Sequence, residues 1–307
     1  MADIGPVPAT EEKDQSKVNL GIQQLFKFIN GSISTFSKTL LALTTAPAWR
    51  AALAIVSTHS VRGLTAINNA STPDTKMDVV FTECVLRNSA GDFVWITGGS
   101  FTVDCGAAGS ALNSRDQSGV FSAGQFLHFY AIYGSGQTSG GLVSTVAPTT
   151  VEGPTLPTNY THWAYLFTAR WDGSSHLLKT YVRGSWVSIN SGGVLSNGAA
   201  TSETAVACGS FVPANALNIR LGVTYLGGTS TAGGRIQDTA HVRVVSGTDY
   251  LTWALDVTGA VLTQMLFPLG DTVIPNVSQQ FYYHHSPSAD SPLLTVVVTG
   301  YQVQNGE

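Results

Sequence analysis

The chain has 307 residues, of which 43% are hydrophobic and only 11% are charged, and its formal net charge is −4. This length allows a sizeable core, and the shortage of charged residues means that Ser, Thr, Asn, Gln and Gly must cover much of the surface. Nucleic-acid binding is not expected, because neutralising phosphates requires clustered Lys and Arg, and the sequence has no such cluster.

The three cysteines, Cys84, Cys105 and Cys208, are widely spaced and form no C-x-x-C motif, so no zinc site is expected. The odd count favours reduced thiols. The first 17 residues lack the apolar stretch of a signal peptide, and no apolar run approaches the ~20 residues of a membrane-spanning helix. These features predict a protein made in the cytoplasm, neither secreted nor inserted into a membrane.

The first 16 residues are predicted to form an extended arm, because Pro6 and Pro8 interrupt regular structure. Such a segment is either a frayed terminus or a peptide that becomes ordered when it docks on a partner. The sequence alone leaves both interpretations open.

Residues 16–43 carry an apolar stripe at helical spacing. Its members are Val18, Ile22, Leu25, Ile29, Ile33, Phe36, Leu40 and Leu43. The steps of three and four residues are those of a coiled coil with one stutter between Ile29 and Ile33. Gly21 and the Asn30-Gly31 pair weaken a continuous helix, so one long helix and two shorter helices both remain possible.

This stripe either lies across the β-rich part of the chain as an amphipathic helix or mediates self-association. Self-association is the favoured interpretation, and the mixture of Ile and Leu at the core positions is compatible with three strands. The eight stripe residues are therefore predicted to be oligomerisation residues of a homotrimer.

After Pro47, residues 48–56 are either a short apolar helix or a first core strand. Residues 62–73 are predicted to be a loop or linker. The domain division expected from these patterns is an arm and helical segment over residues 1–60, followed by a β-sandwich domain over residues 75–307.

From Thr75 onward, short apolar segments alternate with Gly, Ser, Asn and Pro. Strands are predicted at residues 76–86, 93–97, 101–103, 125–133, 162–171, 176–183, 186–189, 205–212, 217–226, 241–245, 250–255, 262–267, 280–284 and 293–301. Loops are predicted at residues 88–92, 106–119, 134–161, 191–200, 227–234 and 286–292. Many short strands without an internal repeat predict a mainly β protein, an antiparallel and jelly-roll-like sandwich.

The densest aromatic block spans residues 121–184. Residues 125–133 are apolar on both faces, which predicts a strand buried on both sides. In residues 162–171 strict alternation places Trp163, Tyr165, Phe167 and Trp171 on one face. Such a row is either the core of a sandwich, the favoured interpretation, or an exposed platform for stacking sugars. Asp172 and Gly173 then turn the chain, and residues 176–183 are expected to return as the partner strand.

No catalytic, metal-binding or cofactor-binding residues stand out. The acids are scattered over turns and strand ends, and no pair of carboxylates is marked as a glycosidase site. His284 and His285 are adjacent in a predicted strand, so they point to opposite faces and are interpreted as surface residues. His128 and His162 lie among aromatic residues and are expected to be hydrogen-bonded core histidines. No enzymatic activity is expected.

One resemblance is carried by the central block. The strand at residues 124–133, the segment Pro154-Thr155-Leu156-Pro157-Thr158-Asn159-Tyr160-Thr161, and the aromatic strand that ends at Asp172-Gly173 resemble a module of tail-fibre and appendage proteins of tailed bacteriophages. The C-terminal residues 280–301 resemble the closing hairpin of the same proteins more weakly. The resemblance does not reach the first 75 residues and includes no catalytic residue.

This resemblance implies a homotrimeric structural protein of the virion. Residues 1–45 would attach it to other virion proteins, and the β domain would bind a host-surface glycan or a neighbouring component. A decoration protein or head fibre on the capsid surface is an alternative. A tail-associated protein that binds or degrades polysaccharide is another.

Overall fold

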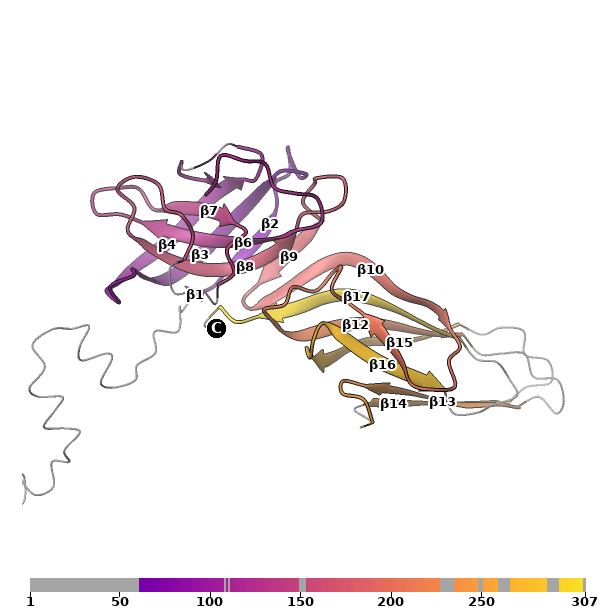
Figure 1. Ribbon diagram of the computed structural model, residues 1–307. Helices are drawn as coiled ribbons and strands as arrows, with labels where there is room; N and C mark the ends of the chain where they lie inside the picture. Colours follow the sequence, from indigo (N-terminus) through magenta and orange to yellow (C-terminus); the bar gives the residue numbers. More distant parts are fainter. Residues whose placement is uncertain are drawn as a thin grey trace, which may run out of the picture. The chain divides into compact units, whose positions relative to one another are not determined.

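The computed structural model describes residues 61–107, 109, 111–148, 153–226, 235–247, 251–258, 266–285 and 293–305. Every regular element within these ranges is a β-strand, as Figure 1 shows. Contacts within the chain divide it after Val56, and Ser57–Glu307 forms one compact unit. The predicted arm and helical stripe, Val18 to Leu43, lie outside the described residues.

The strands of the first half are β1 (Val61–Arg62), β2 (Thr65–Asn68), β3 (Lys76–Arg87), β4 (Phe93–Asp104), β5 (Ser114–Arg115), β6 (Phe126–Tyr133), β7 (Gly140–Ser144), β8 (His162–Arg170) and β9 (Thr180–Arg183). Those of the second half are β10 (Trp186–Gly198), β11 (Thr204–Ala207), β12 (Ala216–Leu226), β13 (Arg235–Arg243), β14 (Leu251–Thr258), β15 (Leu266–Pro275), β16 (Gln280–His285) and β17 (Leu293–Val303).

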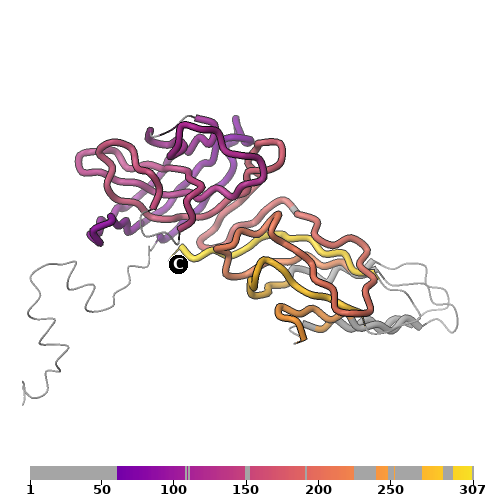
Figure 2. Tube along the Cα trace, viewed as in Figure 1, coloured from indigo at the N-terminus to yellow at the C-terminus, as the bar shows by residue number. Residues whose placement is uncertain are grey.

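Two sheets contain these strands. The larger has the order β15-β12-β17-β10-β9-β2-β3-β8-β6-β7-β5, with β1 and β4 also paired to β3, and the smaller has the order β11-β16-β13-β14. Among the described pairings of named strands, β5 with β7 is parallel and the others are antiparallel. The yellow strand β17 runs between β10 and β12 (Figures 1 and 2). The prediction of a mainly β, antiparallel fold is confirmed, whereas the jelly-roll-like connectivity stays a prediction.

Side chains pack between layers of strands. In the first half, Gly141 of β7 faces Phe101 and Val103 of β4, and a Cβ atom at Gly141 would lie 2.4 Å from the Val103 side chain. In the second half, His285 of β16 bonds the carbonyl oxygen of Gly198 in β10 at 3.0 Å. In the first case two distant strands of the larger sheet face each other, and in the second case a strand of the smaller sheet contacts a strand of the larger one. Both contacts are typical of a sandwich.

The aromatic block forms the core of the first half, but its side chains do not share one face. The pairing of β6 with β8 shifts register between Phe129 and Tyr130, which oppose Phe167 and Tyr165 respectively. The Phe129 and Phe167 rings stack 4.5 Å apart, whereas the Tyr130 ring meets Tyr165 at 5.9 Å. Adjacent residues of β6 point to opposite faces, so the extra residue in β8 moves Phe167 to the face opposite Tyr165. The predicted single row is therefore wrong, because simple alternation ignores a β-bulge.

The segment 62–73 was expected to be a loop or linker, but part of it is a strand. Its residues Thr65–Asn68 form β2, which pairs with β3 on one side and with β9 on the other. A four-residue strand with one buried side chain, Ala66, carries too little hydrophobic pattern to be recognised.

The segment 191–200 was also expected to be a loop, but most of it belongs to β10. Three register shifts against β17, at Ser188/Gly192, Gly193/Leu195 and Leu195/Gly198, accommodate the Gly- and Ser-rich sequence within a continuous strand. A glycine also lies within β4, at Gly99, where a Cβ atom would lie 2.2 Å from the Phe81 ring. Glycine at this position of the strand thus permits a close approach of the Phe81 ring to the backbone.

The segment 176–183 was expected to be the partner strand of residues 162–171. The strand that it contains, β9, does not pair with β8. The Asp172 carboxylate accepts the backbone N–H groups of Ser174 and His176 at 2.8 and 2.9 Å, so the turn itself forms. The chain returns past the end of β8 through an isolated bridge of Trp171 with Leu177 and through a backbone bond from the Leu178 N–H to the Arg170 carbonyl at 2.9 Å. The strand β9 itself pairs with β2 and β10. The edges of β8 are taken by β6 and β3.

Candidate functional site

The aromatic residues that could have formed a sugar platform are buried. Trp163 is 1% exposed and Trp171 is 6% exposed, and both belong to the hydrophobic core. The preference for a core role is confirmed, and these two rings are excluded as a stacking surface.

A buried chain of polar side chains crosses this core. His128 Nδ1 lies 2.8 Å from Thr168 Oγ1, which is 2.7 Å from the Tyr165 hydroxyl, and Asn215 Nδ2 donates to that hydroxyl at 3.0 Å. Burial lowers the pKa of His128 to about 4, so the imidazole is neutral near pH 7. The prediction of a hydrogen-bonded core histidine is confirmed for His128. His162 is half-buried and pairs with the Thr161 hydroxyl at 2.9 Å.

The adjacent histidines of β16 do lie on opposite faces, but they are not both at the surface. His285 is buried, which corrects the expectation, whereas the His284 ring stacks on His241 of β13 at 4.5 Å. Across the described residues, no group of three or more His, Cys, Asp or Glu side chains could hold a metal ion. The described residues also contain no helix long and apolar enough to cross a membrane.

All three cysteines are free and buried. Burial raises the pKa of the Cys84 and Cys208 thiols to about 12 and raises that of Cys105 as well. Buried, protonated thiols of this kind are poor nucleophiles, so their role is packing.

The segment 134–161, predicted to be one long loop, is partly core. Its residues Gly140–Ser144 form β7, are buried throughout, and pair with β6 and β5. On either side of β7, residues 134–139, 145–148 and 153–161 form no strand, and residues 149–152 lie outside the described residues. A buried strand therefore interrupts the predicted loop.

The most distinctive exposed surface lies on the outer face of the larger sheet. One row of directly opposed residues crosses it from β12 to β4: Arg220, Gly300, Ser188, Tyr181, Ile67, Asp78 and Thr102. Directly opposed residues in antiparallel strands place their side chains on the same face. The neighbouring row contains Asn218, Gln302, Trp186, Arg183, Thr65, Val80 and Ser100.

We call the part of this surface formed by Ile67, Lys179, Tyr181, Arg183, Ser188 and Arg220 the β9 face. Tyr181 is 46% exposed and Ile67 is 53% exposed, and the two lie directly opposite each other on β9 and β2. Large apolar side chains left in water together are a common mark of a binding surface.

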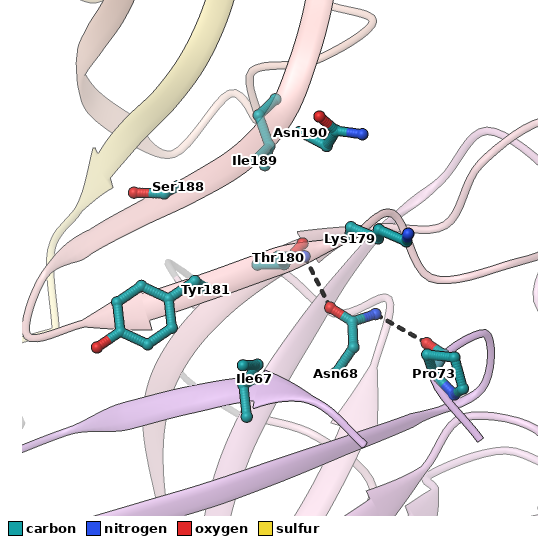
Figure 3. Close-up of a pocket in the computed structure, with 9 residues that line it drawn as sticks. All are labelled: Ile67, Asn68, Pro73, Lys179, Thr180, Tyr181, Ser188, Ile189 and Asn190. Carbon is teal, nitrogen blue, oxygen red and sulfur yellow. Dashed lines mark hydrogen bonds between the residues drawn. The ribbon is translucent and has the colours of Figure 1, made fainter. Parts of the chain in front are cut away.

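The β9 face is hollowed between β2, β9 and β10. A groove of about 420 Å³ is lined there by Ile67, Asn68, Pro73, Lys179, Thr180, Tyr181, Ser188, Ile189 and Asn190 (Figure 3). Its lining offers an aromatic ring, aliphatic groups, one ammonium group, hydroxyls and amides, and it contains no carboxylate. Such a surface can bind a ligand but lacks the pair of acids that glycoside hydrolysis requires.

Asn68 fixes the shape of this groove. Its Nδ2 group donates to the Pro73 carbonyl at 2.8 Å, and its Oδ1 atom accepts the Thr180 backbone N–H at 2.7 Å (Figure 3). This side chain thus ties the loop after β2 to the start of β9 and leaves Tyr181 and Lys179 to face solvent.

A smaller hollow of about 200 Å³ lies beside the edge strand β4, lined by Arg62, Glu83, Val85 and Trp95. Trp95 is 64% exposed, and Arg62 pairs with Glu83 at 3.4 Å. Its lining contains a single acid, so this hollow also lacks the pair of acids that glycoside hydrolysis requires.

Comparison with known proteins identifies no family for this chain. No protein-family model matches the chain, and no curated protein sequence matches it. Among solved structures, the chain is similar to the VP2 subviral particle of infectious bursal disease virus, with 13% identity, a TM-score of 0.23, and coverage of 90% of this chain and 79% of that chain. A second similar structure is that of the Gt strain of the same virus, with 14% identity, a TM-score of 0.18, and coverage of 81% and 72%. At such TM-scores the structures do not superpose as one fold, and no conclusion is drawn from them.

Proposed function

We propose that this chain is a non-enzymatic structural protein of a tailed-phage virion, a trimeric fibre or spike-type appendage. Residues 1–45 attach and trimerise it, and the β unit is exposed for binding a host surface or a neighbouring protein. Three features of the sequence support this proposal: the resemblance of residues 121–184 to appendage proteins, the low charge, and the order of arm, apolar stripe and β unit.

The β9 face is the observation that supports a binding role for the β unit. Its groove holds hydrogen-bonding groups around exposed Tyr181 without any carboxylate, which suits recognition and not hydrolysis.

A capsid decoration protein or head fibre differs from this proposal only in where the arm docks. A polysaccharide-degrading protein would need two carboxylates within ~10 Å in an open groove, and neither groove described above has such a pair. A carbohydrate-binding module that stacks sugars on Trp163 and Trp171 is contradicted by their burial.

Light scattering of the purified full chain tests the trimer. We expect a mass three times that of the chain, and a monomer for the double variant Leu25→Asp and Ile29→Asp, because two buried charges in the stripe prevent association. The matched control is Asn19→Asp and Gln23→Asp, which adds the same charges at the same spacing off the stripe and should leave the trimer intact. A monomeric wild-type chain would contradict the proposal.

A further inference from the structure

We propose that the β9 face binds an acidic polysaccharide, with the carboxylate groups of successive sugars held by Lys179, Arg183 and Arg220 and a sugar ring packed against Tyr181. The inference deepens the proposed function and rests on it in one respect, namely that the β unit is the exposed, recognising part of the protein.

The first argument is the spacing of the cations. Tyr181 and Arg183 lie two residues apart in β9, and Lys179 directly precedes the strand; all three are exposed, with buried Thr180 and Val182 between them. At about 3.3 Å per residue of extended chain, the Cα atoms of Lys179 and Arg183 lie roughly 13 Å apart. Arg220 lies in the row of Tyr181 but three strands away, which is roughly 14 Å at the usual strand separation. Such distances are too large for one small anion and suit a chain with repeated charges.

The second argument is that these charges are not neutralised by the protein. Three other cations of the described part have acidic partners: Arg62 with Glu83, Lys76 with Asp104, and Arg243 with Glu203. Three more, Arg87, Arg115 and Arg170, lie over aromatic rings. Within the described residues, Lys179 and Arg183 form no ion pair.

Arg220 is positioned by neutral groups only. Its Nη1 atom donates to Ser188 Oγ at 3.3 Å, and its guanidinium lies over the Trp186 ring at 4.6 Å. These contacts hold the guanidinium in place without cancelling its charge, which leaves it able to attract an anion.

The same row also contains one acid, Asp78. Asp78 lies beyond Ile67 from Tyr181, and its carboxylate accepts hydrogen bonds from Asn69 Nδ2 at 3.0 Å and Thr102 Oγ1 at 2.6 Å. These neutral donors leave the Asp78 charge in place, but the carboxylate is held on β3, two strands from β9, and it does not line the groove.

The third argument selects a saccharide over a peptide. The backbone groups beneath the groove are used in pairing β2 with β9 and β9 with β10, so an extended peptide cannot add to these strands through its main chain. What the groove offers is the Tyr181 ring, the Ile67 and Pro73 side chains, and the Ser188 and Asn190 polar groups. A sugar ring matches this mixture, because it has an apolar face of C–H groups and a rim of hydroxyls.

The test measures binding of the full chain by calorimetry. The probes are oligosaccharides of galacturonic acid, of hyaluronate and of sialic acid, each beside its carboxyl-reduced counterpart, with oligoglutamate and single-stranded DNA as other polyanions. We expect at least one acidic saccharide to bind, its neutral counterpart to bind at least tenfold more weakly, and added salt to weaken the acidic one.

The decisive variant is Lys179→Gln with Arg183→Gln, which should weaken binding of that saccharide at least tenfold. The matched control is Arg62→Gln with Lys76→Gln, which removes the same charge from the same sheet and should leave affinity unchanged. Tyr181→Ala should also weaken binding, through loss of ring contact alone. Because all these side chains are at the surface, thermal unfolding should confirm that each variant is folded.

Three results would overturn the proposal. They are no binding of any acidic saccharide at concentrations up to about 1 mM, equal loss in the decisive and control variants, and binding of oligoglutamate or DNA as tight as that of the saccharides. Light scattering of the same samples separates this proposal from the proposed function. A monomer that binds would refute only the trimeric appendage, and a trimer that does not bind would refute only the saccharide site.

Discussion

At the scale of single residues, the core of this protein depends on polar groups that are satisfied without charge. His128 is buried, is bonded to Thr168, and has a pKa lowered to about 4 by burial, compared with an ordinary value of 6.5. Below about pH 6.5 the unfolded chain therefore binds a proton that the folded protein does not. The sign follows directly: stability is full above pH 6.5 and falls as the pH drops toward 4.

The expected loss from His128 is roughly 3 kcal/mol by pH 4, since each pKa unit corresponds to about 1.4 kcal/mol. Urea unfolding at pH 7 and pH 4 measures this loss. His128→Gln keeps a polar side chain but does not titrate, so its stability should fall less over the same interval. Parallel loss in the wild type and the variant would show that His128 is not responsible.

At the scale of elements, the sequence pattern predicts where strands lie better than which face and which neighbour each strand has. Alternation in 76–86 and a doubly apolar run in 125–133 correspond to β3 and β6, because burial on one or both faces leaves a direct mark on the sequence. The bulge between β6 and β8 and the pairing of β9 with β2 leave no such mark, because they depend on neighbours far away in the sequence.

The candidate site could not be predicted from the sequence for the same reason, namely that it depends on residues far apart in the chain. No local motif marks the β9 face, because its residues come from β2, β9, β10 and β12 and meet only through strand register. The alternation of Lys179, Tyr181 and Arg183, a cation on each side of an aromatic residue, was the available signal. Only pairing with β2 and β10 shows that this side of the strand faces solvent.

The C-terminal strand is tied to the core of the first half by buried hydrogen bonds. The Tyr301 hydroxyl of β17 donates to the Thr168 carbonyl of β8 at 2.8 Å, and Asn305 Nδ2 donates to the Leu166 and Gly184 carbonyls at 3.1 and 2.9 Å. Tyr301 is fully buried, so the bond is shielded from water. These bonds join elements more than 100 residues apart in the sequence.

Tyr301→Phe should lower the free energy of unfolding by about 1–2 kcal/mol, because it removes the donor from a buried carbonyl while keeping the ring. Tyr181→Phe is the control, since it removes the same hydroxyl from an exposed ring and should change stability by less than about 0.5 kcal/mol. Chemical denaturation of both variants measures the difference. Equal effects would mean that the bond from β17 to β8 contributes little.

At the scale of the whole molecule, we propose that the N-terminal segment attaches the protein and that the β unit recognises its ligand. The apolar stripe from Val18 to Leu43 motivates oligomerisation, and the β9 face motivates recognition. The two roles can fail separately, because the variants proposed for each lie on opposite sides of the contact division at Val56.

The most direct test of the central claim is electron microscopy of purified phage particles that carry the gene for this chain, labelled with gold-conjugated antibodies. Antibodies against the β unit should label intact particles at a tail or collar position, whereas antibodies against residues 1–45 should label only particles that have been disrupted. The pattern follows if the N-terminal segment is buried in its attachment site. Particles that lack the chain, or intact particles labelled only through residues 1–45, would contradict the account.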